Sequence, residues 1–451
     1  MASSYYKYTN GAAGNQKTFT LSGWFKPASS SGDTTLWSYI TSSGGSGPRS
    51  EIYINASYKL LVGINPSGST WYELTFNNVL RDPSAWYHVV IAYDTTQAVE
   101  ANRVKTYING VEYTAASGSY PTLNLDTGWM ADTYDHQIGN YATGSMNFDG
   151  CISHTHFCDG TAYAASDFGE FDSTSGIWVA KTSPSVTYGS NGGFWKFASG
   201  ALTTDSSGSG NTLTAVGTPT ATKDNPDNNF ATLTPLADYY AEGTFSNGNT
   251  KWVSPTDGNH RYVISGHAML AGLWYMEVKM KQANDSGVGI TDKEQPDSSE
   301  NISQTNYGAV YKSSDGYYQV NGGSSTAYGD SYTTDDIIGI YVDLTANKLY
   351  FAKNGTIQNS GTGIDITGTD AMTSPSNSSQ LCYFFGFDKR DGGSTFECNF
   401  GNGYFGTDAI SGAVADAGGE GLFKYNPSTG TFDGASKDFR ALCTNNIATY
   451  G

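Results

Sequence analysis

The stretch IIGIYVDLTANKLYFAKNGTI, residues 337–357, contains two apolar runs joined by a short polar segment and closes on an Asn-Gly pair. Asn354-Gly355 lies where a two-residue type I′ turn needs positive φ twice, which is the strongest short-range signal of a β-hairpin. A second stretch, NRVKTYINGVEY at residues 102–113, carries the same pair at Asn109-Gly110. Internal duplication and a hairpin shared by many sandwiches explain this repeat equally well. Either explanation predicts two antiparallel β domains in tandem.

The composition agrees with an all-β chain. Only 15% of the 451 residues are charged, against roughly 25% in an average globular chain. Glycine contributes 55 residues and aromatic side chains 14%, with 32 tyrosines. Long solvated helices need many charged residues, whereas glycine, polar uncharged residues and aromatics suit short strands joined by tight turns. We therefore expect antiparallel β-sandwiches with helix in under about 10% of the residues.

The charge balance limits the partners. The chain has 24 Lys and Arg against 42 Asp and Glu, a formal net charge of −18. Such a surface repels a phosphate backbone and an anionic membrane, and no apolar run approaches the roughly 18 residues that span a bilayer, so we expect no nucleic acid and no membrane insertion. The N-terminal MASSYYKYTNGAAG has neither a basic flank nor an apolar core, which predicts synthesis in a cytoplasm without a signal peptide. Five cysteines are too few for a disulfide scaffold, and an odd number cannot pair completely within the chain.

Composition shifts divide the chain into four segments. Strand-like alternation predicts one sandwich over residues 1–165 and another over 236–405. Residues 166–235 are rich in Ser, Thr, Gly, Asp and Asn but also contain Trp178 and Trp195, which need burial. This segment is therefore interpreted as a structured connector. Residues 406–451 form a tail with weak periodicity.

Four motifs of the first segment carry a resemblance to a known fold. They are Phe19-Thr-Leu-Ser-Gly-Trp-Phe25, Trp86-Tyr-His-Val-Val-Ile-Ala-Tyr93, Tyr107-Ile-Asn-Gly110, and Ile138-Gly-Asn140 with Phe148-Asp-Gly-Cys-Ile152. The segment resembles the laminin-G-like, concanavalin A-like lectin and glucanase fold. That resemblance implies a jelly-roll sandwich.

Five blocks of the third segment carry a second resemblance. They are Gly272-Leu-Trp-Tyr-Met-Glu-Val278, Val288-Gly-Ile-Thr291, Ile338-Gly-Ile-Tyr-Val-Asp-Leu344, Leu349-Tyr-Phe-Ala-Lys-Asn-Gly355 and Phe396-Glu-Cys-Asn-Phe-Gly401. In their order and spacing they resemble a SPRY domain. SPRY domains bind ligands through loops at one sheet edge, which here implies loops 284–287, 295–306 and 388–394. The recognition candidates on these loops are Asn284, Asp285, Asn301, Asn306, Asp388, Lys389, Arg390 and Asp391.

The connector is similar to segments of tailed-bacteriophage proteins. The motifs are Asp167-Phe-Gly-Glu-Phe-Asp172, Gly176-Ile-Trp178, Asp205-Ser-Ser-Gly-Ser-Gly-Asn211, residues 225–235, and Phe439-Arg-Ala-Leu-Cys-Thr-Asn445 near the C-terminus. The resemblance implies a virion component, assembled in the host cytoplasm in several copies. Its partners would be other capsid or tail proteins, and a host surface glycan or receptor is a further candidate.

Three functional classes compete. The first is a non-catalytic structural or decorating protein of the phage particle that displays a binding surface. The second is a receptor- or glycan-binding adhesin of a tail fibre or spike. The third, a polysaccharide hydrolase, is disfavoured because Glu170-Phe-Asp172 is the nearest match to the E-x-D-x-x-E arrangement of glucanases and Ser175 replaces its second glutamate.

Metal binding has two candidate locations. On a regular strand His154, His156 and Cys158 would share one face and Cys151 would point away, so the segment is either a zinc- or copper-binding strand or a strand of semi-buried side chains. Calcium is a better candidate on family grounds, because several laminin-G-like and lectin domains bind it at a sheet rim. The residues expected near such a rim are Asp126, Asp132, Asp135 and Asn140. No other cofactor is expected.

Adjacent tyrosines suggest exposed rings. Tyr5 and Tyr6, Tyr239 and Tyr240, and Tyr317 and Tyr318 are consecutive. Neighbouring strand residues point to opposite faces, so one ring of each pair could contact a sugar or a protein. The alternative is that these rings cover a sheet or a subunit interface.

Overall fold

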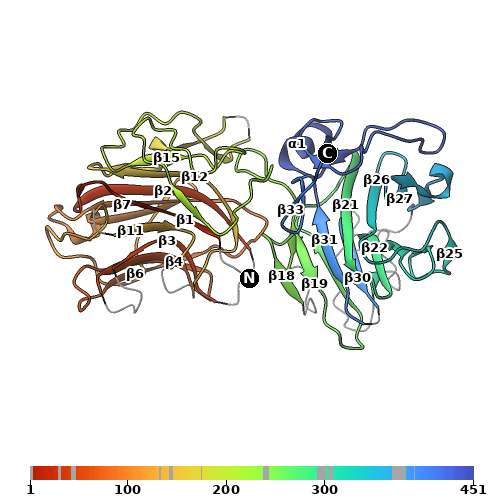
Figure 1. Ribbon diagram of the computed structural model, residues 1–451, viewed down its shortest axis with the longest axis horizontal. Helices are drawn as coiled ribbons and strands as arrows, with labels where there is room; N and C mark the ends of the chain where they lie inside the picture. Colours follow the sequence, from red (N-terminus) through yellow and green to blue (C-terminus); the bar gives the residue numbers. More distant parts are fainter. Residues whose placement is uncertain are drawn as a thin grey trace. The chain divides into compact units, whose positions relative to one another are not determined.

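The computed structural model describes residues 4–28, 32–41, 47–131, 134–141, 146–173, 175–236, 243–291, 301–302, 308–367, 382–390 and 392–451. The chain separates into two compact units (Figure 1). The first unit contains Met1–Ala221 with Asn225–Asp227, and the second contains Thr222–Asp224 with Asn228–Gly451. Each unit is built from two antiparallel sheets packed face to face, so the predicted all-β sandwich class is confirmed.

The first unit pairs an eight-stranded sheet with a six-stranded sheet. The eight-stranded sheet has the order β10 (Ser117–Gly118), β6 (Tyr72–Val79), β5 (Lys59–Asn65), β4 (Arg49–Ile54), β3 (Thr34–Ile40), β11 (Asp135–Ile138), β1 (Tyr5–Thr9) and β16 (Thr214–Val216). The six-stranded sheet has the order β15 (Gly193–Trp195), β12 (Gly150–Asp159), β2 (Thr18–Pro27), β7 (Tyr87–Asp94), β8 (Val104–Ile108) and β9 (Val111–Tyr113). A separate hairpin joins β13 (Gly169–Phe171) to β14 (Trp178–Ala180).

The second unit pairs a seven-stranded sheet with a nine-stranded sheet. The seven-stranded sheet has the order β17 (Leu233–Thr234), β20 (Arg261–Ser265), β30 (Phe384–Lys389), β22 (Ser286–Thr291), β23 (Gly308–Lys312), β24 (Tyr317–Val320) and β25 (Thr326–Ala327). The nine-stranded sheet runs through β18 (Thr244–Ser246), β19 (Lys251–Val253), β31 (Thr395–Asn399), β21 (Leu273–Gln282), β26 (Ile337–Asp343), β27 (Lys348–Lys353) and β28 (Thr356–Ile357). Its other two strands are β29 (Ile364–Asp365) beside β27 and β36 (Arg440–Ala441), which is parallel to β21.

The remaining elements are short. Two small hairpins pair β32 (Tyr404–Phe405) with β33 (Asp408–Ala409) and β34 (Val414–Ala415) with β35 (Leu422–Phe423). Single 3-10 turns lie at η1 (Glu100–Asn102), η2 (Ala165–Asp167) and η4 (Gln358–Gly361). Within the described ranges the α-helix is limited to α1 (Thr444–Tyr450).

Both Asn-Gly pairs form the expected turns. Asn109 and Gly110 have φ of 47° and 81°, and Asn354 and Gly355 have φ of 49° and 81°. Two successive positive φ values define the type I′ geometry, which matches the twist of the flanking strands. The first turn joins β8 to β9 and the second joins β27 to β28.

Each sandwich encloses an aromatic-rich core. In the first unit the strands contribute alternate residues such as Ile52, Val62 and Leu74 to the space between the sheets, around the fully buried Trp37 and Trp129. This alternation follows from the two-residue period of a strand.

A covering segment lies on the outer face of one sheet in each unit. In the first unit residues 163–173 and 175–188 cover the six-stranded sheet and bury Phe168 and Trp178 against Trp24 and Tyr107. In the second unit residues 422–443 cover the nine-stranded sheet and bury Phe423, Phe432 and Phe439 against Tyr275 and Tyr341. These two stretches are called the first and second covering segments.

The two units have different boundaries from the expected domains, because each unit includes its covering segment. Residues 166–221, expected in a connector, belong to the first unit and supply β13, β14, β15 and β16. Residues 406–451, expected as a tail, belong to the second unit and supply β36, which continues the nine-stranded sheet beside β21. Of the two tryptophans that needed burial, Trp178 is buried with the first covering segment on the outer face of the six-stranded sheet, and Trp195 in the core between the two sheets.

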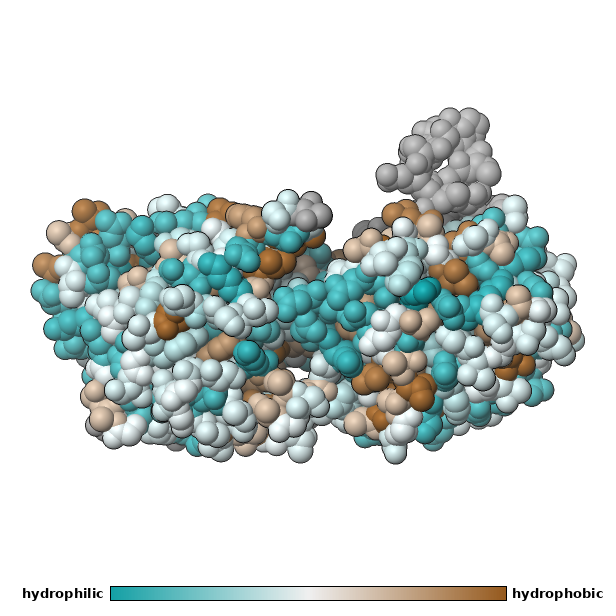
Figure 2. Space-filling model, turned by 90° about the horizontal axis from the view of Figure 1, so that it is seen from above, coloured by the Kyte–Doolittle hydropathy of each residue, from teal (hydrophilic) through white to brown (hydrophobic). Residues whose placement is uncertain are grey.

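The visible surface is mainly polar. Figure 2 looks onto the molecule from the top of Figure 1, and hydrophilic residues cover most of that face, with hydrophobic residues in small separate groups. Phe171 and Ile177 of the first covering segment are among the exposed large apolar residues, at 58% and 63%.

Candidate functional site

The sheet faces that point away from the cores differ in what lies on them. The covering segments occupy the six-stranded and nine-stranded sheets. Ile302 lies on the seven-stranded sheet, where it is buried with Tyr262, Ile264 and Val310. The eight-stranded sheet instead presents half-buried polar and aromatic side chains from β4, β5 and β6. We therefore place the candidate site on that face.

This surface is called the Trp71 face. Its members are Arg49, Glu51, Tyr53, Gly63, Asn65, Trp71, Glu73 and Tyr141. Strand alternation brings them together, because Ile52 and Ile54 of β4 point into the core and leave Arg49, Glu51 and Tyr53 on the opposite side. The same alternation applies to β5, where Leu60, Val62 and Ile64 are the core residues, and to β6, where Leu74 and Phe76 are.

Two carboxylates lie in one row across three strands. Glu51 of β4 is opposite Gly63 of β5, and Gly63 is opposite Glu73 of β6. Two strand spacings separate the glutamate backbones, about 9.6 Å. The missing side chain at Gly63 makes room for Trp71, since a Cβ there would come within 2.5 Å of the indole Cζ2. The indole therefore lies against the Gly63 backbone, between the two acidic residues.

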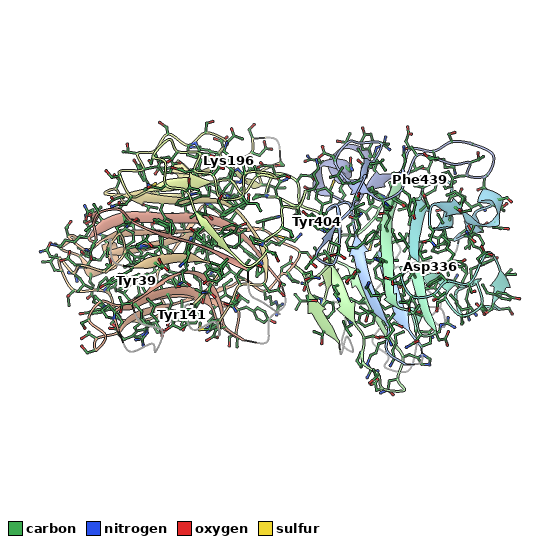
Figure 3. All side chains as sticks on the ribbon, in the orientation of Figure 1. Tyr39, Tyr141, Lys196, Asp336, Tyr404 and Phe439 are labelled. Atoms are coloured by element: carbon green, nitrogen blue, oxygen red, sulfur yellow. The ribbon has the colours of Figure 1, made fainter. Side chains whose placement is uncertain are left out.

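Hydrogen bonds fix one side of this arrangement. The indole Nε1 of Trp71 donates to Glu73 Oε2 at 3.0 Å, and the Tyr53 hydroxyl donates to the same oxygen at 3.5 Å. The Arg49 guanidinium lies 5.0 Å from the indole centroid, in a cation–π contact, and is hydrogen-bonded to Tyr141. Figure 3 labels Tyr141 on this outer side and Tyr39, which is fully buried, on the core side of the sheet.

Glu51 differs from Glu73 in its partners. No described residue donates a hydrogen bond to the Glu51 carboxylate or forms an ion pair with it. Burial raises the pKa of Glu51 to about 7, the negative charges of Glu73 and Asp33 act in the same direction, and Arg49 opposes them. The face therefore combines a fixed aromatic ring with an acceptor that receives no hydrogen bond from the described part of the chain.

The expected calcium residues do not assemble an open ligand set. Asp126 pairs with Lys17 at 3.8 Å, and Asp135 binds Lys7 at 2.7 Å and accepts from Thr9. Asn140 is buried and donates to Gln137. Asp132 lies outside the described residues. Within the part of the chain that is described, no group of three or more His, Cys, Asp or Glu has the geometry to hold a metal.

The SPRY-like loops meet in part. Asn284 Nδ2 donates to the Gly393 carbonyl at 2.8 Å, and the Arg390 amide donates to the Asp285 carbonyl at 3.0 Å. The side chain of Asp285 also accepts from Ser314 Oγ at 3.0 Å. The loops that adjoin β22, β23 and β30 therefore converge at one end of these three strands.

Three of the loop candidates are buried, which corrects the expectation that they face a ligand. Lys389 has no exposed side-chain surface and pairs with Asp257 at 2.7 Å. Asp388 is fully buried and Asn301 is 1% exposed. The reason for the first two is that β30 extends through Lys389 and pairs on both sides, with β20 and β22. Asn306 and Asp391 lie outside the described residues.

A bulge changes the face assignment of the His and Cys residues on β12. The register shifts between Ser153 and His156, and His154 has a φ of 45°. The extra residue places Cys151 on the same outer face as Cys158, contrary to the expectation for a regular strand. His156 is buried, hydrogen-bonded to Tyr188 at 3.0 Å and stacked on Phe194. These side chains support the first covering segment.

The remaining sequence candidates that the structure describes lie outside the Trp71 face. Glu170 lies on the exposed hairpin of the first covering segment, and Asp172 accepts hydrogen bonds from Ser175 there. Tyr6 is buried beside Phe197, whereas Tyr317 is 39% exposed. Tyr239 and Tyr240 lie outside the described residues.

Sequence reasoning missed the Trp71 face. Its signal was present in the alternation Arg49-Ser-Glu-Ile-Tyr-Ile54 and in Trp71-Tyr-Glu73, which place polar and aromatic residues at every second position. The register that aligns Glu51, Gly63 and Glu73 depends on how three strands pair, and single-strand periodicity does not contain it.

Comparisons with known proteins agree with the two sandwiches. Residues 1–165 match the family model of the concanavalin A-like lectin/glucanases superfamily, and residues 273–402 match the SPRY domain model. A search of curated proteins found no match. These family matches suggest a binding role, and none of the comparisons points to a bacteriophage.

Solved structures with similar domains include two from different sources. The SPRY domain of human HERC1 is 17% identical, covers 33% of this chain and 86% of its own, and has a TM-score of 0.27. The Ruminococcus gnavus IT-sialidase CBM40, solved bound to α2,3-sialyllactose, is 16% identical, covers 32% of this chain and 81% of its own, and has a TM-score of 0.25. By its family matches, the protein contains a concanavalin A-like domain followed by a SPRY domain.

Proposed function

We propose that the protein is a non-catalytic binding protein that holds a saccharide on the Trp71 face. The observation that carries the proposal is the Trp71 indole, fixed over Gly63 between two in-register carboxylates, one of which receives no hydrogen bond from the residues that the structure describes. Aromatic rings offer an apolar surface, and carboxylates accept hydrogen bonds from hydroxyl groups. The match to a superfamily that includes lectins supports the same assignment.

The ring between the two carboxylates argues for binding rather than hydrolysis. Retaining glycosidases need two carboxyl groups about 5–5.5 Å apart, and inverting enzymes leave a clear space for water between them. Here the Trp71 ring occupies the space over Gly63, between Glu51 and Glu73. The other carboxylate pair considered, Glu170 and Asp172, lies on an exposed hairpin.

The test is a binding titration of the full chain against an oligosaccharide panel, by isothermal calorimetry. Trp71→Ala should weaken binding about tenfold or more, because it removes the aromatic surface and one fixed donor to Glu73. Tyr317→Ala, an exposed aromatic in the second unit, is the matched control and should bind like the wild type. Equal affinity of Trp71→Ala and wild type would refute the assignment.

We further propose that the chain acts as a component of a tailed-bacteriophage particle. The support is the resemblance, by sequence motif, of residues 167–172, 176–178, 205–211, 225–235 and 439–445 to segments of phage proteins. In a particle many copies would combine weak individual contacts into useful avidity. Mass spectrometry of purified particles from the producing cells should identify the chain, and its absence from intact particles would contradict this part of the proposal.

A further inference from the structure

We propose that the ligand of the Trp71 face is a saccharide that carries protonated amino groups, a glucosamine-type oligosaccharide. This inference rests on the proposed function and adds the chemical class of its ligand. It follows from the hydrogen-bonding capacity and the charge of the face.

The face has acceptors that lack donors. The Glu51 carboxylate receives no hydrogen bond from the described residues. Asn65, which is opposite Arg49 and on the same side of β5 as Gly63, is only 4% exposed, and its Oδ1 has no hydrogen-bond partner within the described ranges. A buried acceptor without a donor loses the hydrogen bonds it made to water. The ligand that fits here therefore supplies N–H or O–H donors.

The aromatic donors of the face are already engaged. The indole N–H of Trp71 and the hydroxyl of Tyr53 both point to Glu73. The guanidinium of Arg49 lies on the indole ring and is hydrogen-bonded to Tyr141. A ligand that presents carboxylate groups would compete with Glu73 for the donors of Trp71 and Tyr53.

The negative charge of the face favours a cationic ligand. Two carboxylates, Glu51 and Glu73, flank Gly63, with the negative charge of Asp33 also acting on Glu51. Arg49 is the neighbouring positive group, and the whole chain carries a net charge of −18. An ammonium group beside Glu51 would form a charge-assisted hydrogen bond, which is about twice as strong as a neutral one. An acidic sugar would meet like charge, which costs affinity.

Calorimetry with the full chain tests the inference. The probes are a glucosamine hexamer, its N-acetylated counterpart and α2,3-sialyllactose, each titrated at two salt concentrations. The wild type should bind the glucosamine hexamer at least about tenfold more tightly than the N-acetylated form, with the preference falling as salt rises. Sialyllactose should bind more weakly than either.

Glu51→Gln isolates the charge, because it keeps the shape of the side chain. It should reduce the preference for the amino form to about twofold or less, because the amino form loses its charge-assisted hydrogen bond whereas both forms keep a neutral acceptor at the amide oxygen. Glu170→Gln, at an exposed carboxylate of the same unit, is the matched control and should keep the wild-type preference. A melting temperature within a few degrees of wild type would show that each variant is folded.

The outcomes separate the two proposals. Equal binding of the amino and N-acetylated hexamers, both lost in Trp71→Ala, would overturn the charge inference and leave saccharide binding standing. A preference for the amino form that survives in Glu51→Gln would also overturn the inference. If neither hexamer nor any member of the oligosaccharide panel binds, the proposed function itself fails.

Discussion

In the first unit the glycine of the Asn-Gly turn lies beneath Trp178, and in the second unit the corresponding glycine lies beneath Tyr425. A Cβ at Gly110 would come within 2.5 Å of the Trp178 ring, and a Cβ at Gly355 would come within 2.5 Å of the Tyr425 ring. In each unit the aromatic residue belongs to the covering segment. The turn therefore shapes a hairpin, and its glycine also leaves room for the aromatic ring of the covering segment.

The two covering segments are held by different chemistry. In the first unit Trp178 Nε1 donates to His88 Nδ1 at 3.0 Å, and His88 Nε2 lies 2.9 Å from Ser22 Oγ. In the second unit Glu277 accepts the backbone amides of Lys424 and Tyr425, each at 2.8 Å. One anchor is a side chain bonded to a neutral imidazole, and the other is backbone bonded to a carboxyl group.

This difference has two consequences. A side-chain anchor is lost when the side chain is removed, whereas a backbone anchor survives substitution. The pKa values of the two buried groups also shift in opposite directions. Burial lowers the pKa of His88 to about 3 and raises the pKa of Glu277 to about 7. The two units should therefore differ in their response to mutation and to pH.

Truncating the aromatic residue of the first covering segment should have the largest effect. Trp178→Ala should destabilise the first unit by about 3–5 kcal/mol, because it removes a buried indole and leaves His88 Nδ1 without its donor. Tyr425→Ala should cost less than half as much, since that ring is half-buried and the backbone amides still reach Glu277. Guanidinium unfolding followed by pulse proteolysis, read out for each unit, measures both. Equal losses would contradict the distinction between the anchors.

Substitutions of the two turn glycines should have the next largest effect on stability. Gly110→Val and Gly355→Val should each cost about 2–3 kcal/mol, from positive φ at a β-branched residue and from contact with the aromatic ring. Gly208→Val is the matched control, because Gly208 has a φ of 86° but nothing within 4 Å of its Cβ position. It should show the backbone cost alone, about 1–2 kcal/mol. If Gly208→Val lowers the free energy of unfolding as much as the two turn-glycine variants do, the ring contacts have no role in their effect.

The pH dependence should have opposite signs in the two units. The pKa of Glu277 is about 7 in the folded state against an ordinary 4.5, so its contribution is present below pH 4.5 and is lost as pH rises through 7, by about 3 kcal/mol. His88 has a folded pKa of about 3 against 6.5, so the stability it favours is present above pH 6.5 and is lost as pH falls toward 3.

Unfolding of each unit at pH 5, 6, 7 and 8 checks this prediction. Between pH 5 and 8 the His88 contribution should strengthen the first unit and the Glu277 contribution should weaken the second. Glu277→Gln should flatten the decline of the second unit, because glutamine does not titrate. A decline of the same slope in wild type and Glu277→Gln would show that another group is responsible.

The smallest effect is expected at the rim where calcium was anticipated. Asp135→Asn should cost less than about 1 kcal/mol, because the Lys7–Asp135 pair is more than one-third exposed. Added calcium should leave the melting temperature of wild type and variant unchanged, since the Asp135 carboxylate is already engaged by Lys7 and Thr9. A rise in melting temperature with calcium that Asp135→Asn abolishes would restore the calcium site.

Local sequence patterns predicted the fold class and both turns. Asn109-Gly110 and Asn354-Gly355 fix their geometry with two adjacent residues, so no tertiary information is needed. The destination of Trp178 was not predictable in this way. Its need for burial was evident, but only the folded sheet shows that Gly110 and His88 form the place that receives it.

The site residues were harder to predict for the same reason. Lys389 was expected on a ligand-binding loop because of the SPRY resemblance, yet strand β30 continues through it and Asp257 neutralises its charge. Glu51 and Glu73 are 22 positions apart, and their alignment depends on strand register. Likewise, one extra residue in the bulge at His154 reversed the expected direction of Cys151.

Hydroxyl-radical footprinting of the full chain, with and without saturating glucosamine hexamer, tests the central claim most directly. The account predicts that the ligand protects Trp71, Tyr53 and Tyr141 from oxidation and leaves Trp178, Tyr425 and Tyr317 unchanged. Protection of Trp178 or Tyr425 with no change at Trp71 would place the ligand on a covering segment and contradict the assignment of the eight-stranded sheet as the binding face.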